Sequence, residues 1–258
     1  MANFPIRMEL LAAHVVDDDR RALWDRNSQW WTNEYIPRAD SDYQDVILPI
    51  LKDVLQGQEK VIDIGGGEGR VSRYLIEEND CEAVCVDFSV SQLCAAHAKG
   101  QGPSFVQANV GSLPFRDGAF DGAVACLVLE HVLELTEALD EANRVLRAEG
   151  KFVLVLNHPV IQTPDSGFIH DHVADPPTKY WRISEYLIET SYFEEVEKGI
   201  FLPYEHRSLS KYINSLVDAG FTIQRLYEPS HSDSFIAKNP EFSSIRSIPR
   251  LLIIICTS

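Results

Sequence analysis

The ten residues VIDIGGGEGR, at positions 61–70, decide the fold of this chain. Residues 61–64 form a short apolar run with β-branched side chains, which is typical of a buried parallel strand. Three glycines follow at once, where a strand must turn sharply and a ligand can approach bare backbone. Apolar positions at helical spacing come next, at Val71, Tyr74 and Leu75. Strand, glycine turn and helix together predict the nucleotide-binding corner of a doubly wound α/β sheet.

The spacing of the glycines separates this turn from two other nucleotide-binding loops. A dinucleotide fingerprint, G-x-G-x-x-G, needs its third glycine at position 70, which Arg70 occupies. The loop also lacks the Lys-Ser/Thr pair of a phosphate-binding P-loop. The pattern is instead D-x-G-x-G-x-G, from Asp63 to Gly69. This spacing disfavours a nicotinamide cofactor.

The pattern from Asp63 to Gly69 resembles motif I of the class I S-adenosylmethionine-dependent methyltransferases. A looser resemblance to their UbiE-like (methyltransferase 11) branch rests on Phe115, Glu228-Pro229 and the helix start from Arg207 to Ser210. The family resemblance is firm over residues 60–157 and loose over the rest. It implies a Rossmann-like α/β fold with a doubly wound, mostly parallel seven-stranded sheet and an antiparallel edge strand. It also implies S-adenosylmethionine as the cofactor. The strands are expected at residues 61–64, 82–86, 104–107, 120–126, 151–156, 221–227 and 251–255.

The same resemblance indicates where the cofactor is expected to bind. Asp87 ends the second strand about twenty residues after the glycines, where a carboxylate accepts hydrogen bonds from ribose hydroxyls; the alternative role is turn formation. Asn109 stands where family members commonly carry an aspartate that receives the adenine amino group, and its amide oxygen can accept the same bond without charge. The carbonyl of Cys126 is expected to hold the amino group of the methionine portion. The expected cofactor-binding residues are Asp63, Gly65, Gly66, Gly67, Asp87, Phe88, Asn109, Val110 and Cys126.

Composition and charge narrow the class of partner. The chain has 258 residues, of which 45% are hydrophobic, and a formal net charge of -16. So acidic a chain is unsuited to a phosphate backbone, and we expect a small-molecule substrate and no nucleic acid. The five cysteines form no C-x-x-C pair, and no signal peptide or membrane-spanning run is evident. We therefore expect a cytoplasmic monomer or homodimer with reduced thiols and no membrane contact.

The segment before the sheet, residues 1–58, is expected to form a helical N-terminal cap. A helix over residues 17–35 opens with an acidic cluster, which suits a helix N-terminus. One face of this helix either packs against the sheet domain or forms an aromatic lid over cofactor and substrate, and the two roles are compatible. Residues 59–258 are expected to form the methyltransferase domain that binds S-adenosylmethionine. The positions that share the helix face are Leu23, Trp24, Trp31 and Tyr35.

A second cap is expected after the fifth strand, at about residues 160–205, where prolines and aromatics interrupt the regular alternation. A segment inserted there lies over the carboxyl edge of the sheet and can shape a substrate pocket. The run His170-Asp171-His172 offers two imidazoles and one carboxylate without helical spacing, so we expect no metal. The expected pocket residues of the two caps are Trp31, Tyr35, Tyr180 and His206.

Methyl transfer from a sulfonium is an in-line displacement, so the protein mainly aligns a nucleophile with the methyl carbon. A hydroxyl or protonated amine acceptor also needs a base. His158 directly follows the fifth strand, and we expect it to be that catalytic base; the alternative is a strand-end histidine bonded to backbone. His131 is expected to orient the loop at the start of the next helix, and the alternative is a catalytic role. That helix is predicted to end at Gly150.

The sequence therefore predicts a methyltransferase that uses S-adenosylmethionine to methylate an O, N or C nucleophile of a small molecule. A non-catalytic protein that binds S-adenosylmethionine or S-adenosylhomocysteine stays open, because binding motifs survive whether or not chemistry does. A nicotinamide-dependent oxidoreductase is the least favoured, because Arg70 replaces the third glycine.

Overall fold

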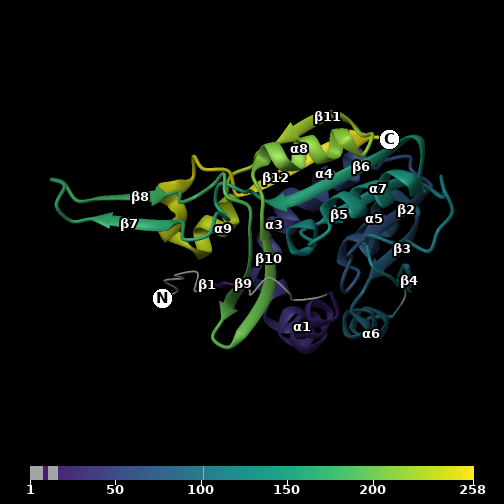
Figure 1. Ribbon diagram of the computed structural model, residues 1–258, viewed down its shortest axis with the longest axis horizontal. Helices are drawn as coiled ribbons and strands as arrows, with labels where there is room; N and C mark the ends of the chain where they lie inside the picture. Colours follow the sequence, from purple (N-terminus) through teal and green to yellow (C-terminus); the bar gives the residue numbers. More distant parts are fainter. Residues whose placement is uncertain (1–7, 11–16, 101) are drawn as a thin grey trace.

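A computed structural model describes residues 8–10, 17–100 and 102–258, and at its centre lies a seven-stranded sheet (Figure 1). The strand order is β11-β12-β6-β5-β2-β3-β4. The strands from β2 to β6 pair in parallel, and β12 is antiparallel to both of its neighbours. The doubly wound, mostly parallel sheet predicted from the sequence is confirmed. Its strands are β2 (Lys60–Ile64), β3 (Glu82–Asp87), β4 (Ser104–Gln107), β5 (Phe120–Cys126), β6 (Leu146–Asn157), β11 (Thr222–Tyr227) and β12 (Leu251–Thr257).

The antiparallel pairing lies at the expected edge of the sheet, where β12 is the second strand and β11 the outermost. β12 pairs with β6 along its whole length, from Leu251 to Thr257. β11 covers the other side of β12. Leu251–Ile254 and Cys256 are buried, as a strand flanked on both sides requires. The apolar run at the end of the sequence is therefore explained by this interior position.

Alternating strand residues feed two hydrophobic cores, one on each face of the sheet. On one face, Ile62 and Leu154 belong to a core shared with α7 and α8. On the other face, Val61 and Val153 belong to a core shared with α4 and α5. Because helices cover both faces, ligand-binding side chains are expected only where the parallel strands end. The helices around the sheet are α4 (Leu48–Val54), α5 (Arg70–Asn79), α6 (Val90–Ala98), α7 (Leu135–Val145), α8 (Leu209–Asp218) and α9 (Asp233–Lys238).

The helix before β6 is shorter than the sequence predicts. α7 ends at Val145, and the next residue, Leu146, already pairs with Phe120 of β5. Gly150 therefore lies inside β6, and the prediction that it ends a helix is wrong. The reason is tertiary, because pairing with β5 begins as soon as the chain reaches the sheet.

The N-terminal cap is helical through most of its described length. A carboxylate of α1 anchors it to the start of α6, because Asp25 Oδ1 accepts hydrogen bonds from Ser89 Oγ at 2.6 Å and Ser91 N at 3.1 Å. In the described ranges, no helix is both long and apolar enough to cross a membrane. The elements are α1 (Asp17–Trp30), η1 (Trp31–Tyr35), α2 (Ile36–Arg38), α3 (Asp40–Asp42) and η2 (Tyr43–Ile47).

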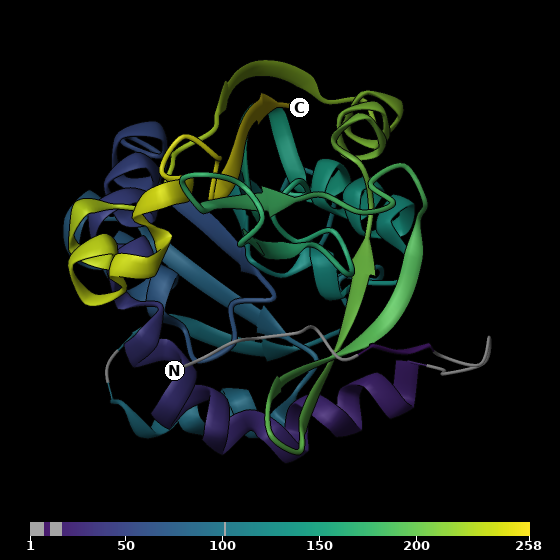
Figure 2. The same cartoon turned by 90° about the vertical axis from the view of Figure 1, so that its left-hand side faces the viewer.

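The cap inserted after β6 is built from strands, so only the N-terminal cap is helical. β9 and β10 form an antiparallel hairpin, and β1 from the N-terminal segment pairs with the free side of β9. The hairpin reaches α1, so the two predicted caps meet (Figure 2). A separate hairpin, β7–β8, projects from the body of the molecule (Figure 1). The bounds are β1 (Met8–Leu10), β7 (Gly167–Asp171), β8 (Thr178–Arg182), β9 (Thr190–Glu197) and β10 (Ile200–His206).

Candidate functional site

A cavity opens at the carboxyl ends of β2, β3 and β5, beneath the N-terminal cap. Every residue that the sequence predicts to bind the cofactor, from Asp63 to Cys126, lines this cavity. The structure therefore brings these residues together, while their individual roles stay predictions. The other residues in the wall are Arg20, Trp24, Trp31, Ile36, Tyr43, Glu68, Arg70, Val71, Gln92, Leu127, Val128, His131, Val132, Leu133 and Glu134.

Two glycines of the loop differ in what surrounds them. A Cβ on Gly66 would lie 2.6 Å from the Asp63 carboxylate and 2.7 Å from Cys85 Sγ, so the loop is packed tightly there. A Cβ on Gly67 would meet nothing closer than Gln92 Oε1 at 3.9 Å, although its φ of +55° disfavours a side chain. Gly66 therefore serves packing, and Gly67 leaves open space toward the cavity.

Asp63 holds the glycine loop against α5. Its Oδ2 accepts hydrogen bonds from Ser72 N at 3.1 Å and Ser72 Oγ at 2.6 Å. Burial raises the pKa of the Asp63 carboxyl to about 6, although the bonds from Ser72 oppose the shift. Asp63 lines the cavity, but the contacts that it makes within the chain position the loop.

Asp87 joins the ends of two neighbouring strands. Its Oδ2 accepts a hydrogen bond from Gly67 N at 2.9 Å, and its Oδ1 accepts one from Ser89 N at 2.8 Å. The side chain is buried, and burial raises its pKa to about 6 against the opposing effect of these backbone bonds. Each carboxylate oxygen has a second acceptor position, so Asp87 can receive two more donors from the cavity.

Asn109 is committed in part to its own loop. Its Oδ1 accepts a hydrogen bond from Gly111 N at 2.9 Å, which fixes the turn after β4. A carboxamide oxygen can accept two hydrogen bonds in all. The adenine contact expected of Asn109 therefore stays compatible with the turn that the residue forms.

The N-terminal cap supplies an aromatic wall. Trp24 and Trp31 line the cavity, and their rings meet edge to face with centroids 4.9 Å apart. Tyr35 lies behind this wall, stacked on Trp31 at 4.0 Å, and burial raises its pKa to about 12. The sequence left packing and lid formation open for this face; the structure shows that Trp24 and Trp31 pack against each other and line the cavity, while a lid over cofactor and substrate stays a prediction.

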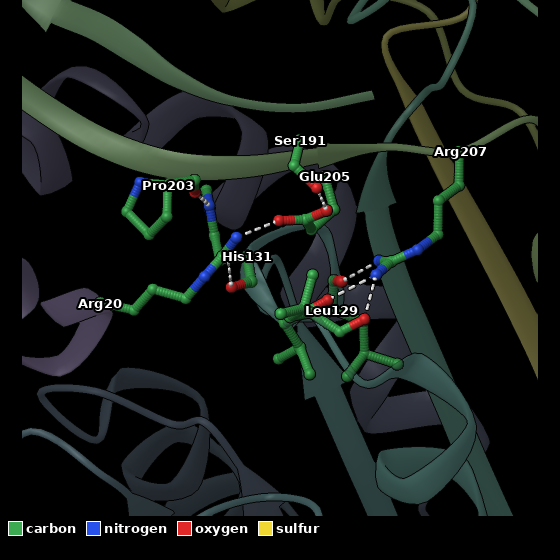
Figure 3. A network of polar contacts seen from close by, with 9 residues as sticks. Arg20, Leu129, His131, Ser191, Pro203, Glu205 and Arg207 are labelled. Atoms are coloured by element: carbon green, nitrogen blue, oxygen red, sulfur yellow. Dashed lines mark hydrogen bonds and ion pairs between the residues drawn. The ribbon is translucent and has the colours of Figure 1, made fainter. Parts of the chain in front are cut away.

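A polar network joins the two caps to the loop after β5 (Figure 3). The Arg20 guanidinium of α1 forms a buried ion pair with Glu205 of β10, and Ser191 Oγ donates to the same carboxylate. Arg207, just after β10, donates to the carbonyls of Leu129, Val132 and Leu133 at 2.6–3.0 Å. The loop that follows β5 is therefore held by the inserted cap.

His131 belongs to the same network and also lines the cavity. Its Nδ1 lies 2.7 Å from the carbonyl oxygen of Pro203, which can only accept, so Nδ1 carries the proton. Nε2 is then an unprotonated acceptor, and it makes no hydrogen bond to the residues that the structure describes. Burial lowers the pKa of His131 to about 4, so the ring is neutral at physiological pH. The prediction that His131 orients this loop agrees with the bond to Pro203, but its place in the cavity wall was not predicted.

Besides Tyr35, three further predicted residues lie outside the cavity wall. His158 is buried, and its Nε2 lies 3.0 Å from Glu228 Oε1. His206 is buried as well, with Nε2 2.9 Å from the carbonyl oxygen of Tyr186. Tyr180 lies on the β7–β8 hairpin and is 49% exposed. Of the predicted pocket residues, Trp31 lines the cavity and Tyr35 supports it.

Some residues in the wall were missed because no local pattern marks them. Arg20 stands in a charged run that is typical of the exposed start of a helix, and Arg70 was used in the sequence analysis only to exclude a dinucleotide site.

The described residues hold no group of three or more His, Cys, Asp or Glu side chains able to bind a metal. The rings of His170 and His172 lie 6.1 Å apart on the projecting hairpin.

The sequence is similar to those of known methyltransferases. A family model described as "Methyltransferase domain" matches residues 62–154. The chain is 32% identical over 110 residues to a demethylmenaquinone methyltransferase of Paenarthrobacter aurescens, a match covering 42% of this chain and 43% of that protein. It is also 32% identical over 91 residues to a malonyl-[acyl-carrier protein] O-methyltransferase of Enterobacter lignolyticus, covering 35% of this chain and 36% of that protein. The chain thus spans less than half the length of either relative.

The fold has a counterpart among solved structures. A crystal structure of an S-adenosylmethionine-dependent methyltransferase from Mesorhizobium loti superposes with a TM-score of 0.69 and 24% sequence identity. The match covers 82% of this chain and 96% of that one. It includes more of the chain than the curated relatives do, and it shows a common fold.

Proposed function

Because this chain belongs to the class I S-adenosylmethionine-dependent methyltransferase family, we propose that it transfers a methyl group from S-adenosylmethionine to a small molecule. The observation that carries the proposal is the cavity that joins the glycine loop, Asp87 and an aromatic wall. The wall of the cavity holds the donors and acceptors of a nucleoside site, and it also holds two tryptophans and the loop after β5.

The residues in the wall fit the proposed cofactor. Asp87 has free acceptor positions for the ribose hydroxyls, and Gly67 leaves room beside it. Gln92 Oε1 is buried there without a hydrogen-bond partner among the described residues, so a bound donor would satisfy it. Asn109 and the backbone of Val110 would hold the adenine. The carbonyl of Cys126 would accept from the amino group of the methionine portion.

When bound, S-adenosylmethionine supplies an electrophilic methyl group together with its leaving group. What this chain's residues contribute is alignment, exclusion of water and, for a hydroxyl or amine acceptor, removal of a proton. Trp24 and Trp31 provide flat apolar walls that orient an acceptor and keep water out.

Two histidines are candidates for taking that proton. His158 was predicted from its place after β6, but its ring is directed to Glu228. His131 is favoured by geometry, because it lines the cavity with an unprotonated Nε2. We propose His131 as the proton acceptor, with His158 as the competing assignment.

The methyl acceptor is defined less closely than the cofactor. The names of the two curated relatives give a demethylmenaquinone and a malonyl-acyl-carrier protein as their substrates, so the family context allows different accepting atoms. We propose an O, N or C nucleophile on a small molecule, in keeping with the net charge of -16. A cytoplasmic location, the absence of a nucleic-acid partner, and a monomeric or homodimeric state remain predictions.

Calorimetric titration with S-adenosylmethionine, S-adenosylhomocysteine and NAD tests the cofactor. We expect micromolar binding of both sulfur nucleotides and none of NAD. Binding of NAD alone would contradict the proposal. Transfer of tritium from methyl-labelled S-adenosylmethionine to a panel of small hydroxyl, amine and activated-carbon acceptors then separates an enzyme from a binding protein that performs no chemistry.

A further inference from the structure

Arg70 has a buried N–H group without a hydrogen-bond partner among the described residues. It is the first residue of α5, directly after the glycine loop, and it lines the cavity. Its Nη2 pairs with Asp40, while Nη1 is buried without a hydrogen-bond partner among the described residues. A buried guanidinium N–H without a partner is costly, so this arrangement indicates a missing acceptor.

The plane of the guanidinium is fixed by an aromatic ring. The Arg70 Cζ lies 4.3 Å from the centroid of Tyr43, which also lines the cavity. The Tyr43 hydroxyl in turn lies 4.0 Å from Cys126 Sγ at the carboxyl end of β5. Arg70 is therefore held beside the end of β5, the region where the amino acid portion of the cofactor is proposed to bind.

Of the two arginines in the cavity wall that the structure describes, Arg70 is the better placed to bind an anionic group. In the described part of the chain, the cavity wall holds two arginines, Arg20 and Arg70. Arg20 is paired with Glu205, and their side chains are only 3% and 6% exposed, although Arg20 Nε is also buried without a hydrogen-bond partner among the described residues. The partner of Arg70, Asp40, is 48% exposed, so solvent weakens that pair. An anion in the cavity can therefore compete for Arg70 more readily than for Arg20.

Arginine suits this task because its fork matches a carboxylate. Two parallel N–H donors bind both carboxylate oxygens, a geometry that lysine cannot reproduce. Elsewhere the wall would repel a carboxylate, because Asp63 and Asp87 lie along it.

We propose that Arg70 binds the α-carboxylate of the amino acid portion of the cofactor, an assignment that rests on the proposed function. Arg70 thereby selects adenosyl ligands that carry the amino acid group over ligands that lack it. The residue that excludes a dinucleotide fingerprint becomes the one that recognises the sulfur nucleotide.

The test compares two ligands and three variants by isothermal titration calorimetry. S-adenosylhomocysteine carries the carboxylate, and 5′-methylthioadenosine lacks the whole amino acid group. For Arg70→Met we expect affinity for S-adenosylhomocysteine to fall about tenfold or more, the usual loss for a charge-assisted pair. Affinity for 5′-methylthioadenosine should change by less than about twofold. Arg70→Lys should lie between the wild type and Arg70→Met, because it keeps the charge and loses the fork.

Asp40→Asn is the matched control for a structural role. If Arg70 acts only by tying the N-terminal cap to the glycine loop, breaking the ion pair from the Asp40 side should weaken S-adenosylhomocysteine binding equally. The proposal expects Asp40→Asn to keep or raise that affinity, because Arg70 is released. Thermal melting of each variant verifies that it is folded.

The outcomes separate the inference from the function on which it rests. A wild-type protein that binds neither ligand contradicts the proposed function, and this inference with it. A wild-type protein that binds S-adenosylhomocysteine while folded Arg70→Met binds it equally well overturns the inference alone. So does an Arg70→Met variant that loses both ligands in equal proportion.

Discussion

Arg20 of α1 and Glu205 of β10 form a buried ion pair between residues 185 positions apart in the sequence. Only 3% and 6% of their side chains are exposed. Arg20 lines the cavity, so the contact that joins the two caps is also part of the site. Closure of the cavity and stability of the caps are therefore coupled.

The first prediction concerns this ion pair. Arg20→Met leaves the Glu205 carboxylate buried without its cation, which should lower the free energy of unfolding by about 3 kcal/mol. Urea denaturation measures the loss. Lys52→Met breaks the pair between Lys52 and Glu78, whose side chains are 43% and 39% exposed, and should cost much less stability than Arg20→Met. Equal losses in the two variants would show that the buried Arg20 pair contributes no more to the free energy of unfolding than the exposed Lys52 pair does.

The second prediction concerns Asp87 and pH. Ribose hydroxyls need the ionised carboxylate, and burial raises its pKa to about 6. Affinity for S-adenosylhomocysteine should therefore be constant above about pH 7 and fall by up to about tenfold per pH unit below pH 6. Calorimetry across this range measures the profile. Asp87→Asn should bind more weakly at neutral pH and flatten the profile; an unchanged acid limb would assign it to Asp63 instead, whose pKa is also about 6.

The same carboxyl should affect stability in the opposite direction. Its pKa is raised in the folded state, so the folded protein holds this proton more tightly than the unfolded chain does. The stability linked to Asp87 is then fully present below its ordinary pKa and is lost as pH rises through about 6. The melting temperature of Asp87→Asn relative to the wild type should therefore be higher at pH 7 than at pH 5. The amide offers one acceptor oxygen where the carboxylate accepts from both Gly67 N and Ser89 N, so the variant also carries a cost that does not depend on pH. A difference in melting temperature that does not rise between pH 5 and pH 7 would contradict this account.

The third prediction separates packing from binding in the glycine loop. Gly66→Ala places a methyl group 2.6 Å from the Asp63 carboxylate and should destabilise the fold by about 2 kcal/mol. Gly67→Ala has room but must hold a φ of +55°, and its methyl group faces the cavity. It should cost about 1 kcal/mol of stability and, in addition, weaken S-adenosylhomocysteine binding.

Gly57→Ala is the control for backbone strain. Gly57 has a φ of +78° with nothing within 4 Å of an added Cβ, and it lies outside the cavity wall. It should match Gly67→Ala in stability and leave ligand affinity unchanged. A similar loss of affinity in both variants would mean that strain, and not the cavity, governs binding.

The fourth prediction distinguishes the two roles of His131. Asparagine can keep an N–H donor near the Pro203 carbonyl and has no counterpart of Nε2, whereas glutamine loses the Nδ1–H donor. His131→Asn should melt close to the wild type, bind S-adenosylhomocysteine normally, and reduce methyl transfer to an acceptor found in the screen by about 100-fold. His131→Gln should be destabilised by about 1 kcal/mol.

His158→Ala is the comparison that decides between the histidines. We expect it to keep turnover, because the ring bonds to Glu228 outside the cavity wall. If His158→Ala instead abolishes methyl transfer while His131→Asn does not, the prediction made from the sequence holds and our assignment of His131 is wrong.

It was predictable that the cofactor-binding residues expected at the strand ends line one cavity, because their positions follow from where the strands end. Asp63, the glycines and Asp87 each stand at the end of a strand or directly after it, and parallel strands deliver their carboxyl ends to one edge. The same rule placed Cys126 at this edge, whereas Asn109 was assigned from the family resemblance. The rule does not suffice for His158, the residue directly after β6, because it gives the position of this residue and not the direction of its ring. That direction depends on Glu228, which follows β11.

The amino-acid sequence by itself determined the strand–glycine–helix corner, the order of apolar strands and the residues at the strand ends. These depend on local periodicity and backbone sterics, which act over a few residues. Only the tertiary structure decided that the two caps are joined by Arg20 and Glu205, that His131 offers an unprotonated Nε2, and that Arg70 has an unsatisfied N–H. Such features arise when burial removes water from polar groups and leaves their partners to be chosen by segments far apart in the chain.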